Sequence, residues 1–337
     1  MSLLASQNLT LLDWAKRRDP DGKIPVIAEL LSQTNEVLFD AVFKEGNQPT
    51  GHRVVVRTGL PTVYWRALNA GVPTSKSTTA QVDEGCAMLE AYSEVDVALA
   101  KLNAAPDGSV SDFRLSEDRA FIESMNQTQA YTMFYGNVAT EAKSYTGLAT
   151  RYSSLSAGNG GNIIDAGGSS TDNTSIYLVV WGDETVFCPF PKGSKAGIDN
   201  QDLGEQTVID ANGGRFQAYR SHYKWDNGLV VKDWRYVVRI ANIDVSNLVS
   251  ESSAADIIKL MSRALDKIPN LNMGRAAFYM NRTVYSMLRI QALGKSNNAV
   301  TIEKGLNQFG TASSWAAFQG VPLRKVDALL NTEARVV

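Results

Sequence analysis

Histidine and cysteine are scarce in this chain, whose 337 residues include two of each. Neither His52 nor His222 has a second histidine or a cysteine at the spacing of a metal site. Because catalysis and metal binding near neutral pH usually draw on histidine, most histidine-based sites are excluded. Cys86 and Cys188 lie too far apart for a zinc knuckle or a disulfide framework, which favours buried free thiols. We therefore expect no metal and no cofactor.

Long apolar runs and an excess of one charge are missing as well. No stretch approaches the roughly 20 apolar residues that cross a bilayer, and no signal peptide pattern opens the chain, so we expect a soluble protein that is intracellular when made. Lys and Arg total 33 against 35 Asp and Glu, a net charge of −2. This balance argues against binding that is driven by phosphate contacts. Hydrophobic residues make up 44% of the chain, enough for one elaborate or two modest folded domains.

Motifs for nucleotides and activated nucleophiles are also absent. There is no Gly-x-Ser-x-Gly elbow and no phosphate-binding loop that ends in Gly-Lys-Ser/Thr. The glycine-rich stretch 158–163 does not match the dinucleotide-binding motif, because Ile163 stands where that motif has its last glycine. A hydrolase or carbohydrate-binding β protein that uses the polar loop 153–175 remains an alternative, although no acid, base or metal set converges there. Four aspartates lack the spacing of a calcium loop and indicate turns: Asp165, Asp172, Asp183 and Asp199.

The first ninety residues contain an arm and a hairpin. Apolar residues on either side of an Asp-Pro-Asp-Gly turn predict an arm with two short helical pieces over 1–38. Two short strand candidates follow at 53–57 and 62–66, joined by Thr-Gly-Leu-Pro. They predict a hairpin-like projection that has little core of its own.

Charge is distributed unevenly around this hairpin. Residues 44–76 carry five basic residues and one acidic residue, whereas residues 77–100 carry five acidic residues and no Lys or Arg. Solvated faces would give the same pattern, but a basic projection and an acidic patch on one chain also suit head-to-tail contact between copies. The residues that we expect in such a contact are Arg53, Arg57 and Arg66 of one copy, against acidic residues among Asp83, Glu84, Glu90 and Glu94 of its neighbour.

The rest of the chain alternates between helices and strands. A long helix is predicted from Ser116, its N-cap, to Tyr135, with Gly136 as its end. In the last third, helices are predicted from Ser253 to the residue before Pro269 and after Asn281. Candidate strands, several separated by glycine turns, lie at 176–181, 185–190, 206–210, 215–225, 229–243 and 276–280, and a turn at 318–322 leads to another.

Several of these stretches together resemble the major capsid protein of tailed bacteriophages, particularly the short-tailed type. Besides the hairpin, they are Phe-Tyr-Met-Asn-Arg-Thr at 278–283, Phe-Gln-Gly-Val-Pro at 318–322, the helix end Met-Phe-Tyr-Gly-Asn at 133–137, Tyr-Lys-Trp-Asp-Asn-Gly-Leu at 223–229 and Trp-Arg at 234–235. The resemblance covers nearly the whole chain, and the residues that carry it are packing residues.

The resemblance implies an α+β fold of the tailed-phage (Hong Kong 97-type) capsid class. Its parts would be an N-terminal arm (1–38), an extended β-hairpin loop (39–90), a peripheral domain with a spine helix (91–250) and an axial domain (251–337). In most members the β-rich segment follows the axial helices, whereas here it precedes them. We therefore expect a rearranged connectivity.

The function that the resemblance implies is structural, not enzymatic. Copies of the chain would assemble in the host bacterial cytoplasm into pentamers and hexamers of an icosahedral virion shell, which encloses double-stranded DNA without sequence-specific binding. Portal, scaffolding and decoration or cement proteins would be its partners, with no membrane. An encapsulin-like compartment shell is the alternative that uses the same fold.

Overall fold

The computed structural model describes residues 9, 31–103, 109–210, 213–251, 253–294, 300–306 and 312–337. The chain divides into two compact units. Unit 1 comprises residues 1–33, 88–129 and 197–226, and unit 2 comprises 34–87, 130–196 and 227–337. The helical pieces predicted within residues 10–30 lie outside the described residues. Across the described ranges, every helix is too short or too polar to cross a membrane.

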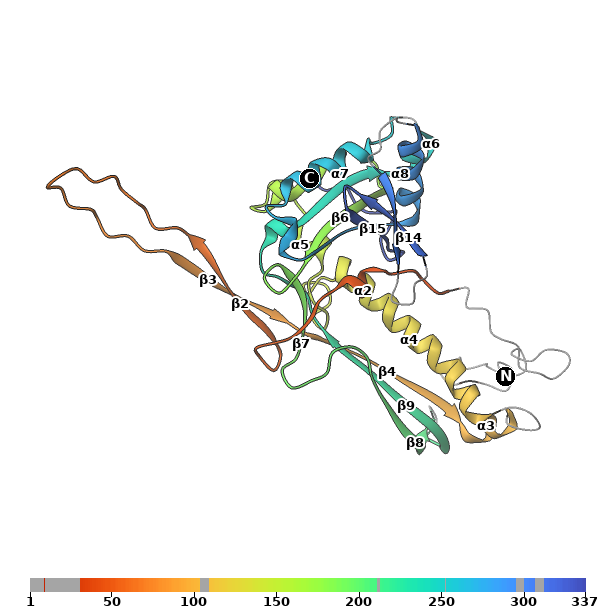
Figure 1. The fold of residues 1–337 in the computed structure, drawn as a ribbon. Coiled ribbons are helices and arrows are strands. Elements are labelled where there is room, and N and C mark those ends of the chain that lie inside the picture. Colours follow the sequence, from red (N-terminus) through yellow and green to blue (C-terminus); the bar gives the residue numbers. More distant parts are fainter. Residues whose placement is uncertain are drawn as a thin grey trace. The chain divides into compact units, whose positions relative to one another are not determined.

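Unit 2 is built on a mixed sheet with β6 as its central strand (Figure 1). Every residue of β6 is buried. A strand buried on both faces is expected to be apolar throughout, and most of β6 follows that rule. Among the described residues ten strands join in the order β1 (Phe43–Glu45), β7 (Val186–Phe190), β6 (Asn173–Trp181), β12 (Arg275–Met280), β15 (Val321–Lys325), β14 (Ala312–Phe318) and β13 (Val300–Leu306), with β10 (Val230–Val231) on β7 and β11 (Val237–Asp244) between β6 and β5 (Ile163–Asp165).

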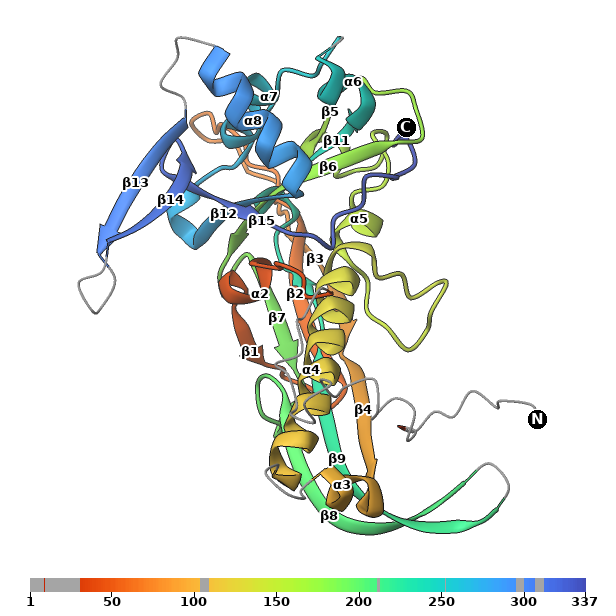
Figure 2. The ribbon, with the colours of Figure 1, turned by 90° about the vertical axis from the view of Figure 1, so that its right-hand side faces the viewer.

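The two faces of β6 belong to two hydrophobic clusters, because successive side chains of a strand point to opposite sides. Leu178 and its even-numbered neighbours pack with α6 (Val245–Ser250), α7 (Ile257–Lys267) and α8 (Arg282–Gly294). Figure 2 shows these helices over the sheet. Tyr177 and its odd-numbered neighbours pack with Met133 and Phe134. Each large apolar side chain buried in this way contributes about 1.5–3 kcal/mol.

The helices of the last third begin at capping side chains. Asn281 accepts a hydrogen bond from the backbone N–H of Val284 at 2.8 Å, so α8 begins where the sequence predicts. The predicted start of α7 at Ser253 is wrong: Asp256 is the N-cap and accepts from the N–H of Lys259. The predicted end before Pro269 is confirmed.

The long helix α4 (Val110–Tyr135) is longer than predicted. Ser116 is not its N-cap but lies inside it and donates to the carbonyl of Phe113. Ser109 takes the capping position and accepts from the N–H of Ser111 at 3.1 Å. Gly136 ends the helix as predicted, and a Cβ at this position would lie 2.2 Å from the carbonyl oxygen of Tyr145.

The sheet of unit 1 has three strands, with β9 (Arg215–Asn227) between β4 (Ala87–Asp96) and β8 (Asp199–Ile209). β8 begins earlier than the predicted strand 206–210. One face of β9 buries Tyr223 and Trp225. Val95 lies in a small cluster with residues of α4 and α3 (Val97–Asn103). Shorter elements, all in unit 2, are α2 (Val37–Asp40), α5 (Leu148–Arg151) and the 3-10 turns Gly160–Asn162, Trp234–Tyr236 and Leu271–Met273.

The predicted order of segments is present, with the β-rich block before α7 and α8. That block and the last third nevertheless share one sheet, because β6 pairs antiparallel with β12 and places Leu178 opposite Phe278. The predicted boundary between 91–250 and 251–337 therefore falls inside unit 2. The roles of these two segments as peripheral and axial domains stay predictions.

The two free cysteines differ in burial: Cys188 on β7 is fully buried, as predicted, and Cys86 is half-buried. Burial raises the pKa of the Cys188 thiol to about 12, so the reactive thiolate is scarce at pH 8. We expect iodoacetamide at pH 8 to leave Cys188 unmodified in the native chain and to alkylate it in urea. Mass spectrometry of peptides from both samples checks this. Equal labelling of Cys188 in the two samples would contradict the buried, protonated thiol.

Candidate functional site

The most prominent feature of unit 2 is a two-stranded arm that extends away from the ten-stranded sheet (Figure 1). Strand β2 (Gly51–Gly59) pairs antiparallel with β3 (Thr78–Gly85), and Arg53 lies opposite Asp83. The hairpin itself is confirmed, but the prediction of 62–66 as its second strand is wrong. Those residues form no strand, because Pro61 supplies no backbone donor and the exposed side chains that follow have no surface to pack against.

The root of the arm is packed against the rest of unit 2. Val54 packs with Phe187 and Val230 in a small buried cluster. Glu84, at the end of β3, accepts two hydrogen bonds from the guanidinium of Arg151, at 2.6 and 2.7 Å. A Cβ at Gly51 would lie 2.1 Å from the carbonyl oxygen of Glu84, so the two strands approach each other as closely as glycine permits.

The first of the two histidines has a structural position at this root. The ring of His52 meets the ring of Phe187 edge to face, with the centroids 5.1 Å apart. Its Nδ1 accepts a hydrogen bond from the N–H of Asn47 at 3.3 Å. Burial, together with the nearby Lys44 and Lys232, lowers the pKa of His52, so the ring is neutral at pH 7. A neutral ring packed on an aromatic side chain fits the predicted structural role.

The carboxylates expected to receive a neighbour's arginines all have a partner in their own chain. Within unit 2, Asp83 pairs with Arg53 at 2.6 Å, and the hydrogen bond from Arg53 lowers the pKa of Asp83. Glu84 pairs with Arg151, as described above. Within unit 1, Glu94 pairs with Arg220 at 2.7 Å and Glu90 lies 3.3 Å from His222, whose ring stacks on Tyr92. The expected contact between copies stays a prediction.

The three arginines of the arm also differ from one another. Arg53 is held by Asp83, and Arg66 donates to the carbonyl of Ala70 at 2.7 Å. For Arg57, which is exposed on β2, the described residues supply no side-chain acceptor. Among the described residues, the charge of Arg53 is therefore paired with Asp83, whereas Arg57 and Arg66 have no carboxylate partner.

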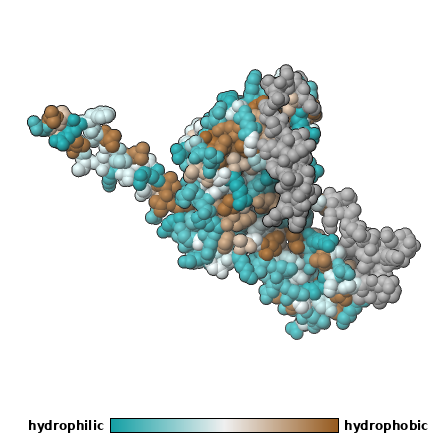
Figure 3. Space-filling model, viewed as in Figure 1, coloured by the Kyte–Doolittle hydropathy of each residue, from teal (hydrophilic) through white to brown (hydrophobic). Residues whose placement is uncertain are grey.

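An apolar tip is the part of the site that the sequence reasoning missed. Trp65 is fully exposed, and the same is nearly true of Leu60, Val63 and Leu68. In Figure 3 the brown atoms of apolar residues are spread along the arm and at its tip. Exposed apolar patches of this kind mark surfaces that bind a partner. The sequence contains a feature that could have predicted this tip: residues 60–72 are rich in apolar residues, although they lie in a segment predicted to have little core.

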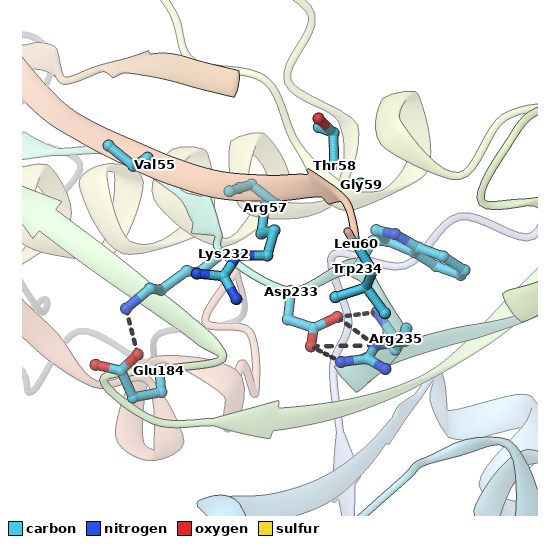
Figure 4. Close-up of a pocket in the computed structure, with 11 residues that line it drawn as sticks. Val55, Arg57, Thr58, Gly59, Leu60, Glu184, Lys232, Asp233, Trp234 and Arg235 are labelled. Atoms are coloured by element: carbon cyan, nitrogen blue, oxygen red, sulfur yellow. Dashed lines mark hydrogen bonds and ion pairs between the residues drawn. The ribbon is translucent and has the colours of Figure 1, made fainter. Parts of the chain in front are cut away.

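A groove of about 580 Å³ lies beside the outer half of β2. Residues 55–60 form one wall, and Glu184 with residues 232–235 forms the other (Figure 4). The charges of the second wall balance one another, because Lys232 pairs with Glu184 and Arg235 pairs with Asp233 at 2.7 Å. Arg57 extends into the groove in Figure 4, and among the described residues it has no ion-pair partner. The arm thus offers an apolar tip and a positively charged groove for binding.

Comparison with known proteins places this chain in a family. Residues 19–337 match the family model of the major capsid protein GP7. A chain in the near-atomic resolution structure of bacteriophage Epsilon15 is 31% identical and superposes with a TM-score of 0.73, over 100% of this chain and 99% of that chain.

More distant structures are similar over a smaller share of the chain. A chain of the holo-SrpI encapsulin complex from Synechococcus elongatus PCC 7942 is 11% identical with a TM-score of 0.42, over 69% of this chain and 96% of that chain. No curated protein sequence matches the chain. The match along nearly its whole length shows that this protein belongs to the major capsid protein GP7 family and has the tailed-phage (Hong Kong 97-type) capsid fold.

Proposed function

We propose that copies of this chain assemble into the pentamers and hexamers of an icosahedral shell that encloses packaged double-stranded DNA. The family is that of a structural shell protein. The observation that carries the proposal is the arm, because an isolated two-stranded ribbon is marginally stable in water and this one ends in exposed apolar side chains. Contact with a neighbouring subunit both supports the ribbon and covers its tip.

The segments of the chain have distinct roles in this proposal. Residues 1–38 act as an N-terminal arm and 39–90 as the extended loop, while 91–250 and 251–337 supply the peripheral and axial domains. Assembly takes place in the host bacterial cytoplasm with a scaffolding protein, and a portal protein and decoration proteins complete the particle. The near-zero net charge suits this function, because a strongly basic wall would hold DNA phosphates tightly.

The apolar tip and the arginines contribute differently to the contact between copies. Apolar burial supplies most of the affinity, whereas exposed charges set the orientation and the rate of association. In this contact Arg57 and Arg66 approach acidic residues of the neighbour. Reversing the charge of both arginines is expected to slow assembly and make it more dependent on salt. Light scattering during assembly at low and high ionic strength checks this, and unchanged kinetics would count against a role for these charges.

The first test of the proposed function is the assembly state of the purified chain. Negative-stain electron microscopy and sedimentation are applied to the chain alone and to the chain co-expressed with neighbouring phage genes. We expect closed shells of uniform size or rings of capsomers in at least one of the two samples. A chain that stays monomeric in both would contradict the proposal.

A further inference from the structure

The C-terminal segment, residues 327–337, is attached to the rest of unit 2 by polar contacts. The carboxylate of Glu333 accepts a hydrogen bond from Arg239 at 2.7 Å, and both side chains are buried. At the end of the segment, a main-chain oxygen of Val337 accepts a hydrogen bond from the N–H of Leu155 at 3.0 Å. Docking of the segment therefore holds one internal arginine and the stretch of backbone that follows α5.

Arg239 in turn holds the end of α5 (Leu148–Arg151). A helix of one turn is marginal by itself, and the carbonyl groups at its end have no partner inside the helix. The guanidinium of Arg239 donates to two of these carbonyls, that of Ala149 at 3.2 Å and that of Tyr152 at 2.8 Å. The position of α5 therefore depends on Arg239, which is itself held by Glu333.

Arg151, the last residue of α5, holds the root of the arm. Its guanidinium donates two hydrogen bonds to Glu84 at 2.6 and 2.7 Å, and a third to the carbonyl of Leu229 at 3.1 Å. The side chains of Arg151 and Glu84 are 18% and 16% exposed, so water screens this pair only in part. Two parallel hydrogen bonds between arginine and a carboxylate also fix the orientation of the two groups. The direction of the arm therefore depends on where α5 places Arg151.

Apolar packing alone gives the arm little support. At its root, Val54 forms a small buried cluster with Phe187 and Val230. Farther along the two strands, Val55 is 54% exposed and Val82 is 44% exposed. Because a two-stranded ribbon is marginally stable by itself, the polar contacts at the root carry much of its orientation.

We infer that docking of the C-terminal segment fixes the direction of the arm, through Glu333, Arg239, α5, Arg151 and Glu84 in that order. With the segment docked, Arg239 caps α5 and Arg151 holds Glu84. With the segment undocked, Arg239 loses its counterion, α5 loses its cap and the arm pivots at its root. Arg151 is thus a positioning residue for the arm.

The consequence for assembly rests on the proposed function, in which the arm carries the contact between copies. A chain whose C-terminal segment is docked presents the arm in one direction, ready to meet a neighbour. A chain whose segment is undocked presents it in many directions, and only a fraction of such chains is competent at any moment. The C-terminal segment therefore regulates assembly without touching the neighbouring copy.

Pulsed electron paramagnetic resonance measures the direction of the arm in the single chain. Spin labels are attached to Gln81→Cys on β3 and Ser286→Cys on α8, which are both exposed positions of unit 2. Cys86→Ser removes the half-buried thiol and keeps a hydrogen-bond donor, and Cys188 is fully buried. The chain is kept dilute enough to stay monomeric, which sedimentation velocity verifies.

Glu333→Ala and Arg151→Gln are each expected to widen the distribution of distances between the labels roughly twofold, because a released arm samples many directions. Glu333→Gln is used as well, in case the alanine chain does not fold. Arg235→Gln is the matched control, because it breaks the exposed ion pair with Asp233 and leaves this path intact. The combined Glu333 and Arg151 variant should be no wider than Arg151→Gln alone, because both changes act in series on one path.

Three results would overturn the inference. They are a wild-type distribution in the folded Glu333 variants, a wild-type distribution in Arg151→Gln, and widths that add in the combined variant. Hydrogen exchange of β6 and β12 is measured in the same chains, and faster exchange there would show general loosening of unit 2 in place of a specific effect on the arm.

Light scattering tests the consequence for assembly. Arg151→Gln is expected to assemble roughly tenfold more slowly than Arg235→Gln, because fewer chains present the arm correctly. Equal rates, with the distances changed as expected, would overturn the regulation of assembly. The distances are measured on single chains, so their failure leaves the shell function standing, whereas a wild-type chain that never assembles overturns the shell function and leaves the distances to decide the rest.

Discussion

Replacing Trp65 and Leu68 by serine is expected to leave the chain folded and to prevent its assembly. Both side chains lie at the tip of the arm and are exposed over nearly their whole surface in the single chain. The fold therefore does not depend on them. Burial of each in a neighbour contributes about 1.5–3 kcal/mol, so together they contribute about 3–6 kcal/mol to each contact. A loss of this size weakens one contact roughly 10²–10⁴-fold, and every copy in a ring repeats it.

Sedimentation velocity and negative-stain microscopy measure this effect, and circular dichroism confirms that the variant is folded. Val249→Ser is the matched control, because Val249 is a half-exposed apolar residue on α6, away from the arm. We expect the control to assemble like the wild type. Particles formed by the Trp65→Ser, Leu68→Ser chain at the wild-type threshold concentration would show that the tip does not carry the contact.

Glu333→Ala is expected to destabilise the folded chain by about 3–5 kcal/mol, the usual effect of removing one partner of a buried ion pair. The side chains of Glu333 and Arg239 are each 5% exposed, and Arg239 donates to Glu333 at 2.7 Å. Tyr135 and Ser175 also donate hydrogen bonds to this carboxylate. Burial and the nearby Glu333 raise the pKa of the Tyr135 hydroxyl, so Tyr135 stays protonated as a donor.

The loss of stability arises because Arg239 stays buried when the Glu333 carboxylate is removed. Arg239 also donates to the carbonyls of Tyr152 and Ala149, at 2.8 and 3.2 Å, and lies over the ring of Tyr177. Removal of Glu333 therefore leaves a positive charge in the core without a counterion. Replacing both members, with Arg239→Met and Glu333→Leu, is expected to recover most of the loss, because no buried charge is left unpaired.

Urea unfolding followed by tryptophan fluorescence measures these differences, in the Trp65→Ser, Leu68→Ser background so that assembly does not contribute to stability. Glu333→Gln, which keeps an acceptor and loses the charge, should fall between the wild type and Glu333→Ala. Glu141→Ala, at an exposed position, should stay within about 0.5 kcal/mol. A Glu333→Ala chain as stable as this control would show that the buried pair does not hold the C-terminal segment.

Local signals accounted for the elements that were predicted well. Asn281 begins α8 through a hydrogen bond to a backbone group three residues away, and Gly136 ends α4. The turn between β14 and β15 contains Gly320 at a φ of 83°, a conformation that glycine adopts without strain. Each of these effects acts within a few residues, which is why a single sequence reveals it.

The errors have a common physical origin. The segments 62–66 and 78–85 were both available to pair with β2, and the β-branched and aromatic residues of 62–66 favoured the wrong one. Strand pairing is decided by the surface on which the strands pack, and 62–66 has none. The carboxylates Glu84, Glu90 and Glu94 looked available for a neighbour because their partners, Arg151, His222 and Arg220, lie far away in the sequence.

The sequence by itself determined the fold class, the membership of the capsid family, several element ends and the existence of a projecting hairpin, because caps, turns and apolar periodicity act over short distances. Only the tertiary structure decided which strands pair, that one sheet joins the β-rich block to the last third, and which charges are already neutralised. Those outcomes depend on contacts between residues that are distant in the chain. The exposed tip, and the lack of an ion-pair partner for Arg57 among the described residues, became visible only in the tertiary structure.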